Sequence, residues 1–292
     1  MNGFLLVYKE PGCTSHDVVA KVRNLTKAKT GHLGTLDPFA SGLLPIALGK
    51  ATRFSDYFLN KDKGYIFTIK WGEETDTLDN TGTITNNSGK IPSEQEILDN
   101  IPTFLGESEQ VPPQFSALKI KGKKAYEYAR EGVEVELKKR PITIYQLELL
   151  RHGKNYSKLK LRCSKGTYVR ALARDIAYKL GTVGHLTYLE RDYISGFDAT
   201  KSPLNSEFLF KEAVKEDLEQ KILNLDSLIK YSYNLHLGVN HYKALKNGAK
   251  ILINNLPFKE EKIIKVKLGR DFVAIATYQA GLLKPKMILI NN

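Results

Sequence analysis

One carboxylate, Asp37, stands in a short glycine-containing run at residues 31–38, which reads Gly-His-Leu-Gly-Thr-Leu-Asp-Pro. Pro38 disfavours the helical region for Asp37 and favours an extended backbone. Gly31 and Gly34 permit positive φ or the close approach of a bulky ligand. The apolar run that follows predicts a buried segment, so the acid would be fixed at the edge of the core. A nucleophile or general base is often presented in this way, although a short Asp-Pro pattern more commonly marks an ordinary turn.

The wider sequence around Asp37 favours a catalytic role for this residue over an ordinary turn. It reads Gly-His-x-Gly-Thr-Leu-Asp-Pro-x-Ala-x-Gly-Leu-Leu-Pro and is followed by Leu-Gly-Lys-Ala-Thr at residues 48–52. This run resembles the signature of the TruB-type tRNA pseudouridine synthases, which isomerise uridine to pseudouridine at position 55 in the T loop of tRNA. Stretches at residues 72–82, 113–119, 140–144 and 164–170 agree with that family in the same order. The resemblance covers roughly residues 3–197, and a weaker one continues to the C-terminus.

The composition favours a polyanionic partner. The chain has 292 residues, 42% of them hydrophobic, with 44 Lys and Arg against 32 Asp and Glu, which gives a formal net charge of +12. Contacts with phosphates supply most nucleic-acid affinity, so RNA is a natural partner for so basic a chain. A solvated basic surface explains the same charge equally well.

The cysteines and histidines argue against a metal site. Cys13 and Cys163 lie far apart, and the six histidines include no His-x-x-x-His pair. There is also no phosphate-binding loop or dinucleotide-binding motif, so we expect no metal and no cofactor. The apolar N-terminal run at residues 1–8 is too short for a membrane span and lacks a basic flank, which predicts a cytoplasmic protein without membrane attachment.

The residue patterns predict an α+β fold. A helix is expected at residues 15–27, with Ser15 as its N-cap, and an amphipathic helix is expected from Thr167 to Gly181. The other expected elements are strands at residues 64–71, 133–137, 142–151 and 158–163, a hairpin or loop at 80–89, and helices at 93–101 and 123–131. Hairpins mixed with helices indicate a largely antiparallel mixed sheet flanked by helices. The resemblance implies the same architecture, the pseudouridine synthase fold.

The C-terminal part of the chain predicts a second domain. A charged helical stretch at residues 205–221 closes a catalytic domain of residues 1–229. Residues 230–292 contain a helix at about 239–247 and strands at 263–268, 272–278 and 287–290. A short piece so rich in strands predicts a small β-barrel, and it resembles the PUA-type RNA-binding domain that accompanies this family.

The resemblance assigns Asp37 as the catalytic carboxylate. Burial raises the pKa of carboxyl groups, so a buried nucleophile needs a neighbouring cation. The resemblance places Arg170 against Asp37, whereas arginines in general are usually solvated. It also matches Tyr65, which would stack on the extruded uracil and help to remove the C5 proton; by itself, a tyrosine near a strand more often only packs.

Three further residues are assigned to substrate binding. Tyr168 would line the uracil pocket, Leu189 would floor it, and His32 would stabilise the extruded base or the RNA loop. His32 could equally cap its own turn. The family pattern Leu-Arg-Arg is here Leu189-Glu190-Arg191, a charge reversal that puts a phosphate contact at Glu190 in doubt.

Other polar residues are expected to play supporting roles. The loop at residues 9–12 departs from the family's Lys-Pro-x-Gly in the place of its proline, but Lys9 and Gly12 still align, so this loop is expected to support a wall of the site. Asp76 and Asp79 are interpreted as turn residues rather than paired carboxylates or metal ligands. Basic side chains at residues 119–124 and 138–140 could grip phosphates while the target uridine flips out.

The function predicted from these features is that of a stand-alone tRNA pseudouridine(55) synthase, an isomerase acting on the T-arm stem-loop as a monomer without an obligate protein partner. Two alternatives remain open. One is the guide-RNA-dependent branch that modifies ribosomal RNA, and the other is a non-catalytic RNA-binding or tRNA-folding protein.

Overall fold

The computed structural model describes residues 1–120, 122–197, 203–229, 231, 233–254, 256–258 and 260–289. The chain divides into two compact units, Leu5–Ile222 with Met1 and Leu223–Asn292 with Asn2–Phe4. Lys121 of the predicted basic segment and Ile290 at the end of the last predicted strand lie outside the described residues. In the described part of the chain, no helix combines the length and the apolar character needed to cross a membrane.

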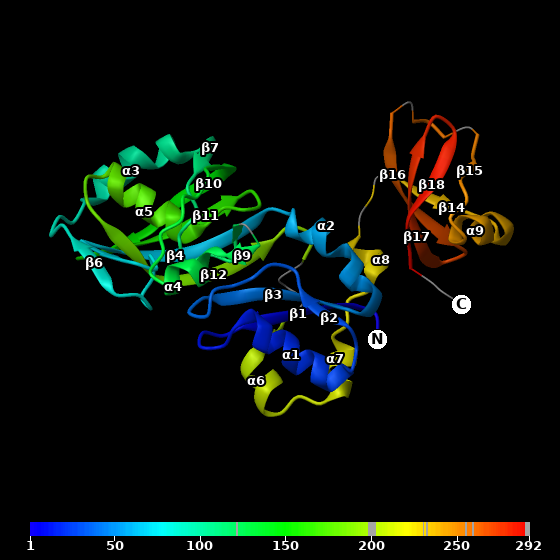
Figure 1. The fold of residues 1–292 in the computed structure, drawn as a ribbon, viewed down its shortest axis with the longest axis horizontal. Helices are drawn as coiled ribbons and strands as arrows, with labels where there is room; N and C mark the ends of the chain where they lie inside the picture. The colour runs from blue at the N-terminus through cyan, green and yellow to red at the C-terminus, as the bar shows by residue number, and fades with distance from the viewer. Residues whose placement is uncertain are drawn as a thin grey trace. The chain divides into compact units, whose positions relative to one another are not determined.

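The first unit is built on a nine-stranded mixed sheet (Figure 1). Its strands in spatial order are β13 (Leu204–Asn205), β1 (Gly3–Lys9), β3 (Ser41–Leu48), β12 (Gly184–Ile194), β4 (Lys63–Trp71), β11 (Tyr156–Cys163), β10 (Arg140–His152) and β7 (Gly106–Gln110), with β2 (Thr30–His32) paired to β3. The β1–β13 and β3–β12 pairs are parallel, and every pair from β12 to β7 is antiparallel. The predicted largely antiparallel α+β sheet is confirmed.

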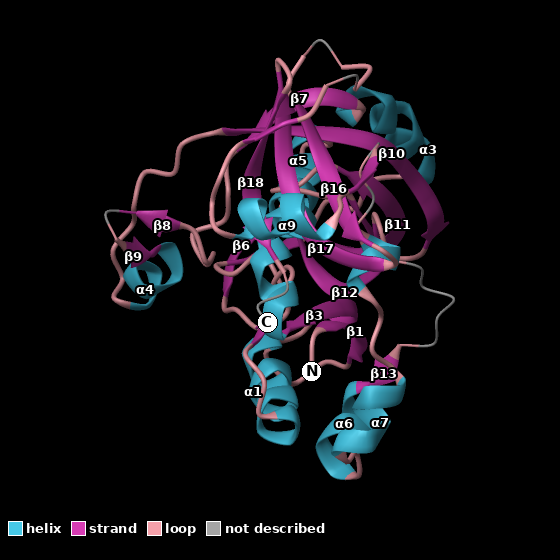
Figure 2. Cartoon of the chain, turned by 90° about the vertical axis from the view of Figure 1, so that its right-hand side faces the viewer, coloured by secondary structure: helices cyan, strands magenta, loops and turns pink. Residues whose placement is uncertain are grey.

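Helices and small hairpins surround this sheet. The helices are α1 (Ser15–Thr26), α2 (Ser55–Leu59), α3 (Glu94–Asn100), α4 (Ala125–Arg130), α5 (Val169–Lys179), α6 (Ser206–Lys211) and α7 (Lys215–Gln220), with 3-10 helices η1 (Gly49–Phe54) and η2 (Ile101–Phe104). The hairpins are β5 (Glu73–Thr75) with β6 (Ile84–Asn87), and β8 (Lys119–Ile120) with β9 (Lys123–Lys124). Figure 1 shows α1, α6 and α7 near β1 and β3, and α3 and α5 toward β10. Figure 2 shows that β8, β9 and α4 project from the body of the unit.

Two predictions about these elements are wrong. Thr14, not Ser15, caps α1, because its hydroxyl accepts from the Asp17 amide and Asp17 bonds back in a capping box. Residues 133–137 alternate as a strand would, but they form no regular structure. The predicted helical stretch at 205–221 is confirmed, and it consists of two short helices, because α6 ends at Lys211 and α7 begins after Val214.

Side chains along the central strands alternate between a buried face and a half-exposed face of the sheet. On β4, Tyr65, Phe67 and Ile69 are buried and alternate with the half-buried Ile66 and Thr68. On β11 every second residue is buried in the same way. Helix α5 contacts β12 and β4, and its apolar stripe belongs to the same core as the buried face of β4. The first turn of α5 is thereby held against the strands that carry Tyr65 and Leu189.

The second unit is a small sheet with one longer helix. Its elements are α8 (Leu225–Leu228), α9 (Val239–Lys246) and five strands in the order β14 (Asn234–His236), β16 (Lys262–Leu268), β17 (Asp271–Gln279), β18 (Leu282–Ile288) and β15 (Ile251–Leu252). The described strands form a curled half-barrel, in line with the predicted barrel-like domain. This unit begins at Leu223, before the predicted boundary at residues 229–230, and α8 is bound within it because Asp226 pairs with Lys265 and Lys267.

Candidate active site

The loop that carries Asp37 is fixed on both sides by buried groups. The Ser15 hydroxyl donates to the Leu36 carbonyl and accepts from the Leu36 amide. The buried ammonium of Lys9 donates to the Pro38 carbonyl at 3.1 Å. Asp37 therefore lies between two anchored peptides, and the expected supporting role of Lys9 is seen directly.

Arg191 holds the other end of the same loop. Its guanidinium donates to the carbonyls of Leu43 (2.8 Å), Thr35 (3.2 Å) and Gly34 (3.0 Å). Gly34 has φ of +135°, a conformation that favours glycine, so a substitution there would strain the loop. Gly31 does not have positive φ, and the space around it is open, so of its two expected uses only the close approach of a ligand remains a prediction.

Asp37 makes a two-point ion pair with Arg170. Arg170 Nε lies 3.0 Å from Asp37 Oδ2, and Arg170 Nη2 lies 3.1 Å from Asp37 Oδ1. The Arg170 side chain is 6% exposed, whereas that of Asp37 is 33% exposed and lines a cavity. The arginine is thus a buried counter-charge, and the carboxylate keeps an open side toward a ligand.

Arg170 is itself shared with a second carboxylate. Its Nη1 lies 3.4 Å from buried Asp79 Oδ2 and donates to the Thr77 carbonyl, and its Nη2 also donates to the Phe115 carbonyl. Asp79 additionally accepts from Thr77 and Thr81 in the turn. Asp76 is a turn residue as predicted, because it accepts from the Thr83 amide. Asp79 is also a turn residue, but it has a second role as a partner of Arg170.

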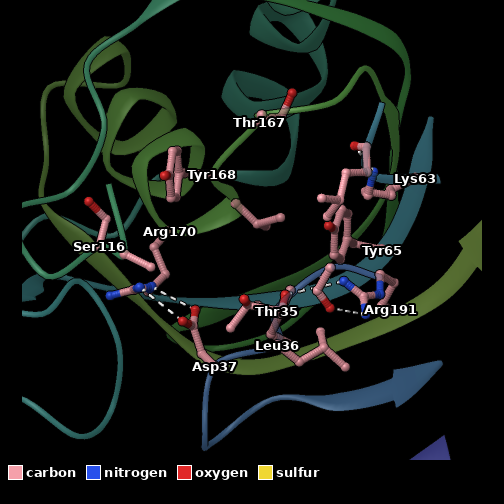
Figure 3. A pocket seen from close by; sticks show the side chains of 16 residues that line it. Thr35, Leu36, Asp37, Lys63, Tyr65, Ser116, Thr167, Tyr168, Arg170 and Arg191 are labelled. Carbon is pink, nitrogen blue, oxygen red and sulfur yellow. Dashed lines mark hydrogen bonds and ion pairs between the residues drawn. The ribbon is translucent and has the colours of Figure 1, made fainter. Parts of the chain in front are cut away.

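The cavity beside Asp37 has a volume of about 320 Å³ (Figure 3). Strands β4 and β12 supply Lys63, Tyr65, Leu189 and Arg191 to its lining, while Tyr168 and Arg170 come from the start of α5. Burial raises the pKa of Tyr65 to about 12 and lowers that of Lys63 to about 8. Apolar side chains such as Leu189, beside a carboxylate and several cations, suit a ring that is both apolar on its faces and polar at its edge.

Gln110, at the end of β7, fixes the backbone of Tyr168. Its amide nitrogen donates to the Tyr168 carbonyl at 3.1 Å, and its amide oxygen accepts from the Tyr168 N–H at 2.9 Å. Gln110 is 2% exposed, so both bonds lie away from solvent. Tyr168 and the first turn of α5 are thereby held in one position.

Comparison with known proteins identifies the family of this site. Residues 22–169 match the model of the TruB family pseudouridylate synthase N-terminal domain. The chain is 40% identical over 299 residues to a tRNA pseudouridine synthase B of Rhizobium etli, covering 99% of this chain and 96% of the relative. It is 39% identical to that of Caldanaerobacter subterraneus subsp. tengcongensis, covering 99% of each. The chain belongs to the TruB family.

Solved structures share the fold of this TruB chain. A chain in an H/ACA ribonucleoprotein bound to a substrate RNA matches with a TM-score of 0.72 at 20% identity, covering 99% of this chain and 85% of that one. A chain in a Cbf5–Nop10–Gar1 complex matches with a TM-score of 0.70 at 23% identity, covering 99% and 84%. The pseudouridine synthase fold with a PUA-like second unit is thus confirmed.

The structure brings together all but one of the site residues predicted from the sequence. Asp37, Tyr65, Tyr168, Arg170 and Leu189 line one cavity. His32 lies on β2 and does not line it. The Nδ1 atom of His32 is buried without a hydrogen-bond partner, and burial lowers the pKa of the ring.

Glu190 lies outside the cavity of this TruB protein. Successive residues of a strand face opposite sides of the sheet, and Leu189 and Arg191 both line the cavity. The Glu190 carboxylate instead accepts hydrogen bonds from the hydroxyls of Tyr8 and Tyr188. The charge reversal relative to the family pattern therefore does not alter the cavity wall.

The sequence did not single out Lys63, Ser116 or a role for Arg191, although all three line the cavity. Arg191 and Ser116 lie inside stretches that resemble the family, and this position was the signal that could have identified them as cavity residues. Lys63 lies two residues before Tyr65 and so shares the face of β4 that carries it. Within the described ranges, no group of three His, Cys, Asp or Glu side chains is placed to hold a metal.

Proposed function

We propose that this protein isomerises uridine to pseudouridine at position 55 in the T loop of tRNA. The observation that carries the proposal is the Asp37–Arg170 ion pair, set at the edge of a cavity lined by Tyr65 and Leu189. The reaction breaks the bond from uracil N1 to ribose C1′, turns the base and joins C5 to C1′. The C5 proton leaves, and N1 gains one. The isomerisation has no net redox change.

The roles of the site residues follow from their positions. Asp37 is the reacting carboxylate at the ribose, and Arg170 keeps it charged. Tyr65 and Tyr168 bind the flipped base, and Leu189 floors it. With a pKa of about 12, the Tyr65 hydroxyl is protonated at neutral pH. This supports stacking and hydrogen-bond donation by Tyr65 more directly than action as a base on C5. His32, outside the cavity, would contact the rearranged RNA loop.

RNA binding is assigned to exposed cations and to the second unit. Lys119 and Lys124 lie on the projecting β8–β9 hairpin, and Lys138 and Lys139 are exposed before β10. Phosphate contacts here would offset the few kcal/mol needed to flip a base. Residues 1–229 would carry catalysis and residues 230–292 would bind RNA. The protein would act as a monomer without an obligate protein partner.

The test uses a T-arm hairpin with tritium at C5 of its uridines and purified protein, without added RNA or protein. Tritium release at the position equivalent to uridine 55 supports the proposal. A hairpin with cytidine at that position is the matched control and should release no tritium above background. Release only after a guide RNA or partner protein is added would favour the guide-dependent alternative. Binding without any release would favour a non-catalytic RNA-binding protein.

A further inference from the structure

Gln110 is a buried polar residue at the end of an exposed strand. Strand β7 forms an edge of the nine-stranded sheet, and its first four residues are exposed, whereas Gln110 is buried. Glutamine is mostly exposed in proteins, because its side-chain amide loses its hydrogen bonds to water on burial. Here both ends of the amide are bonded, to the backbone N–H and the carbonyl of Tyr168. The burial of Gln110 thus has a specific partner at the start of α5.

Tyr168 stands immediately before α5, in the position that usually carries a capping residue. Ser, Thr, Asp and Asn are preferred there, because their side chains bond the free N–H groups of the first turn. With the described residues, the Tyr168 side chain makes no bond of this kind, and its backbone is extended, with φ of −95° and ψ of 111°. Gln110 instead holds this helix entry from another strand. Position 168 can therefore carry an aromatic side chain that lines the cavity.

The stretch after Gln110 follows one face of α5. Arg174 Nη2 donates to the Val111 carbonyl at 3.1 Å, and Arg170 Nη2 donates to the Phe115 carbonyl at 2.9 Å. Arg170 and Arg174 are four residues apart, so they lie on the same face of the helix. In these two contacts the helix supplies a long, flexible side chain, whereas the Gln110 side chain bonds the backbone at the helix entry. Gln110 is therefore the contact that fixes this backbone most directly.

Two groups of the active site depend on the position of that backbone. Tyr168 lines the cavity, and Arg170, two residues later, holds Asp37 through contacts of 3.0 and 3.1 Å. In Figure 3, Tyr168 and Arg170 come from the start of the same helix, and Arg170 reaches Asp37. Misplacing a reacting group by about 1 Å can reduce turnover about 100-fold. A small shift at the start of α5 would thus misplace the bound base and the carboxylate together.

We propose that Gln110 is a positioning residue for the reaction, which fixes Tyr168 and Arg170 so that the flipped uridine meets Asp37 in a reactive geometry. Gln110 is not among the described residues that line the cavity, so it acts through these two residues and not on the substrate. Its loss should therefore lower kcat. The affinity for RNA depends largely on phosphate contacts elsewhere and should change little.

The test compares Gln110→Met with wild type in tritium release from the T-arm hairpin, with kcat and KM determined separately. Methionine has a similar size and no amide, so both bonds to Tyr168 are lost, while the Tyr168 carbonyl keeps its bond from the Leu172 amide. We expect kcat to fall about 30-fold and KM to change less than about threefold. Gln110→Leu also lacks the amide and should behave alike, so the result does not depend on the folding of one variant.

Gln114→Met is the matched control. The Gln114 side chain also donates to a backbone carbonyl, that of Val135, which lies outside α5. This substitution removes the same amide from the same part of the chain, and kcat should stay within about twofold of wild type. A loss of kcat in Gln114→Met as large as in Gln110→Met would overturn the proposal.

A double variant separates positioning from a general loss of structure. In a Tyr168→Leu background the positioned ring is already absent, so adding Gln110→Met should reduce the rate less than about fivefold further. Single-turnover measurements with excess protein keep these low rates measurable. A merely structural role of Gln110 would reduce the rate by the same factor in both backgrounds. Equal factors, or a rise in KM without a fall in kcat, would overturn the proposal.

This proposal rests on the proposed function, and the two fail differently. If the wild-type protein releases no tritium from the hairpin, the function itself is wrong. If the wild-type protein is active and Gln110→Met has the same kcat, only the role of Gln110 is wrong.

Discussion

Two buried arginines line the same cavity and are held in different ways. Arg170 pairs with two carboxylates, Asp37 and Asp79, and also donates to two carbonyls. Arg191 donates to three backbone carbonyls, and no ion pair with a carboxylate is seen for it among the described residues. One arginine therefore sets the charge of the reacting group, while the other shapes the loop that presents it.

The difference matters because buried charges are costly unless they are compensated. A buried pair that loses one partner leaves the other charge alone, at a cost of about 3–5 kcal/mol. Carbonyl dipoles stabilise a guanidinium less specifically than carboxylates do. The comparison thus predicts that the two arginines have separable effects on turnover, stability and loop motion.

Of the two arginine substitutions, Arg170→Met is expected to have the larger effect. Turnover should fall by about 100-fold or more, because Asp37 loses its counter-charge, and the free energy of unfolding should fall by about 3–5 kcal/mol, because Asp79 is left buried and unpaired. Adding Asp79→Asn should restore much of the stability and none of the turnover. Tritium release and urea unfolding measure the two quantities. Recovery of turnover in the double variant would show that Arg170 acts only through stability.

Arg191→Met should act mainly on the loop. Three carbonyls lose their donor, which should cost about 2–4 kcal/mol of stability, with turnover reduced about tenfold. Hydrogen exchange at the amides of residues 33–37 should become faster in this variant and change little in Arg170→Met. Arg191→Lys is the conservative control and should recover part of the protection. Equal hydrogen-exchange rates at residues 33–37 in Arg170→Met and Arg191→Met would contradict the claim that only Arg191 holds the loop.

Lys63 adds a pH-dependent cation beside Arg191. Its pKa falls from 10.5 in the unfolded reference to about 8, so between these values the unfolded state binds more protons. The contribution of Lys63 to stability should therefore rise as the pH increases from about 8 to 10.5. The free energy of unfolding, compared between wild type and Lys63→Met at pH 7.5, 8.5 and 9.5, checks this. A difference that stays constant with pH would contradict the shifted pKa.

The smallest effect on function is expected for Glu190→Arg, which restores the usual family pattern beside Arg191. Glu190 bonds to Tyr8 and Tyr188 outside the cavity, so stability should fall by about 1–3 kcal/mol. Turnover and RNA affinity should stay within about twofold. A clear gain in RNA affinity would place a phosphate at this position after all.

Much of this site was predictable because the family-like stretches mark residues that meet in space. Asp37, Arg170, Tyr65, Tyr168 and Leu189 come from distant parts of the sequence and line one cavity. The strong periodicity of α5 and the capping box at Ser93 also gave correct elements. Each of these motifs and elements lies within a short stretch of sequence, so residue type and spacing are sufficient to recognise it.

What could not be predicted depends on burial and on partners supplied by the fold. The two bonds between Gln110 and Tyr168 are evident only once the fold brings the end of β7 to the start of α5. Asp79 reads as a turn residue, and its second role requires Arg170 to approach from α5. Residues 133–137 alternate apolar and polar side chains, yet they form no strand. Alternation alone does not specify a hydrogen-bonding partner.

The most direct test of this account is Asp37→Asn, measured in parallel for tritium release from the T-arm hairpin and for binding of the same hairpin. We predict a loss of turnover of at least about a thousandfold, the scale expected when a reacting group is removed, with RNA affinity within about threefold of wild type. Undiminished tritium release by Asp37→Asn would contradict the assignment of Asp37 as the carboxylate that Arg170 holds for the reaction.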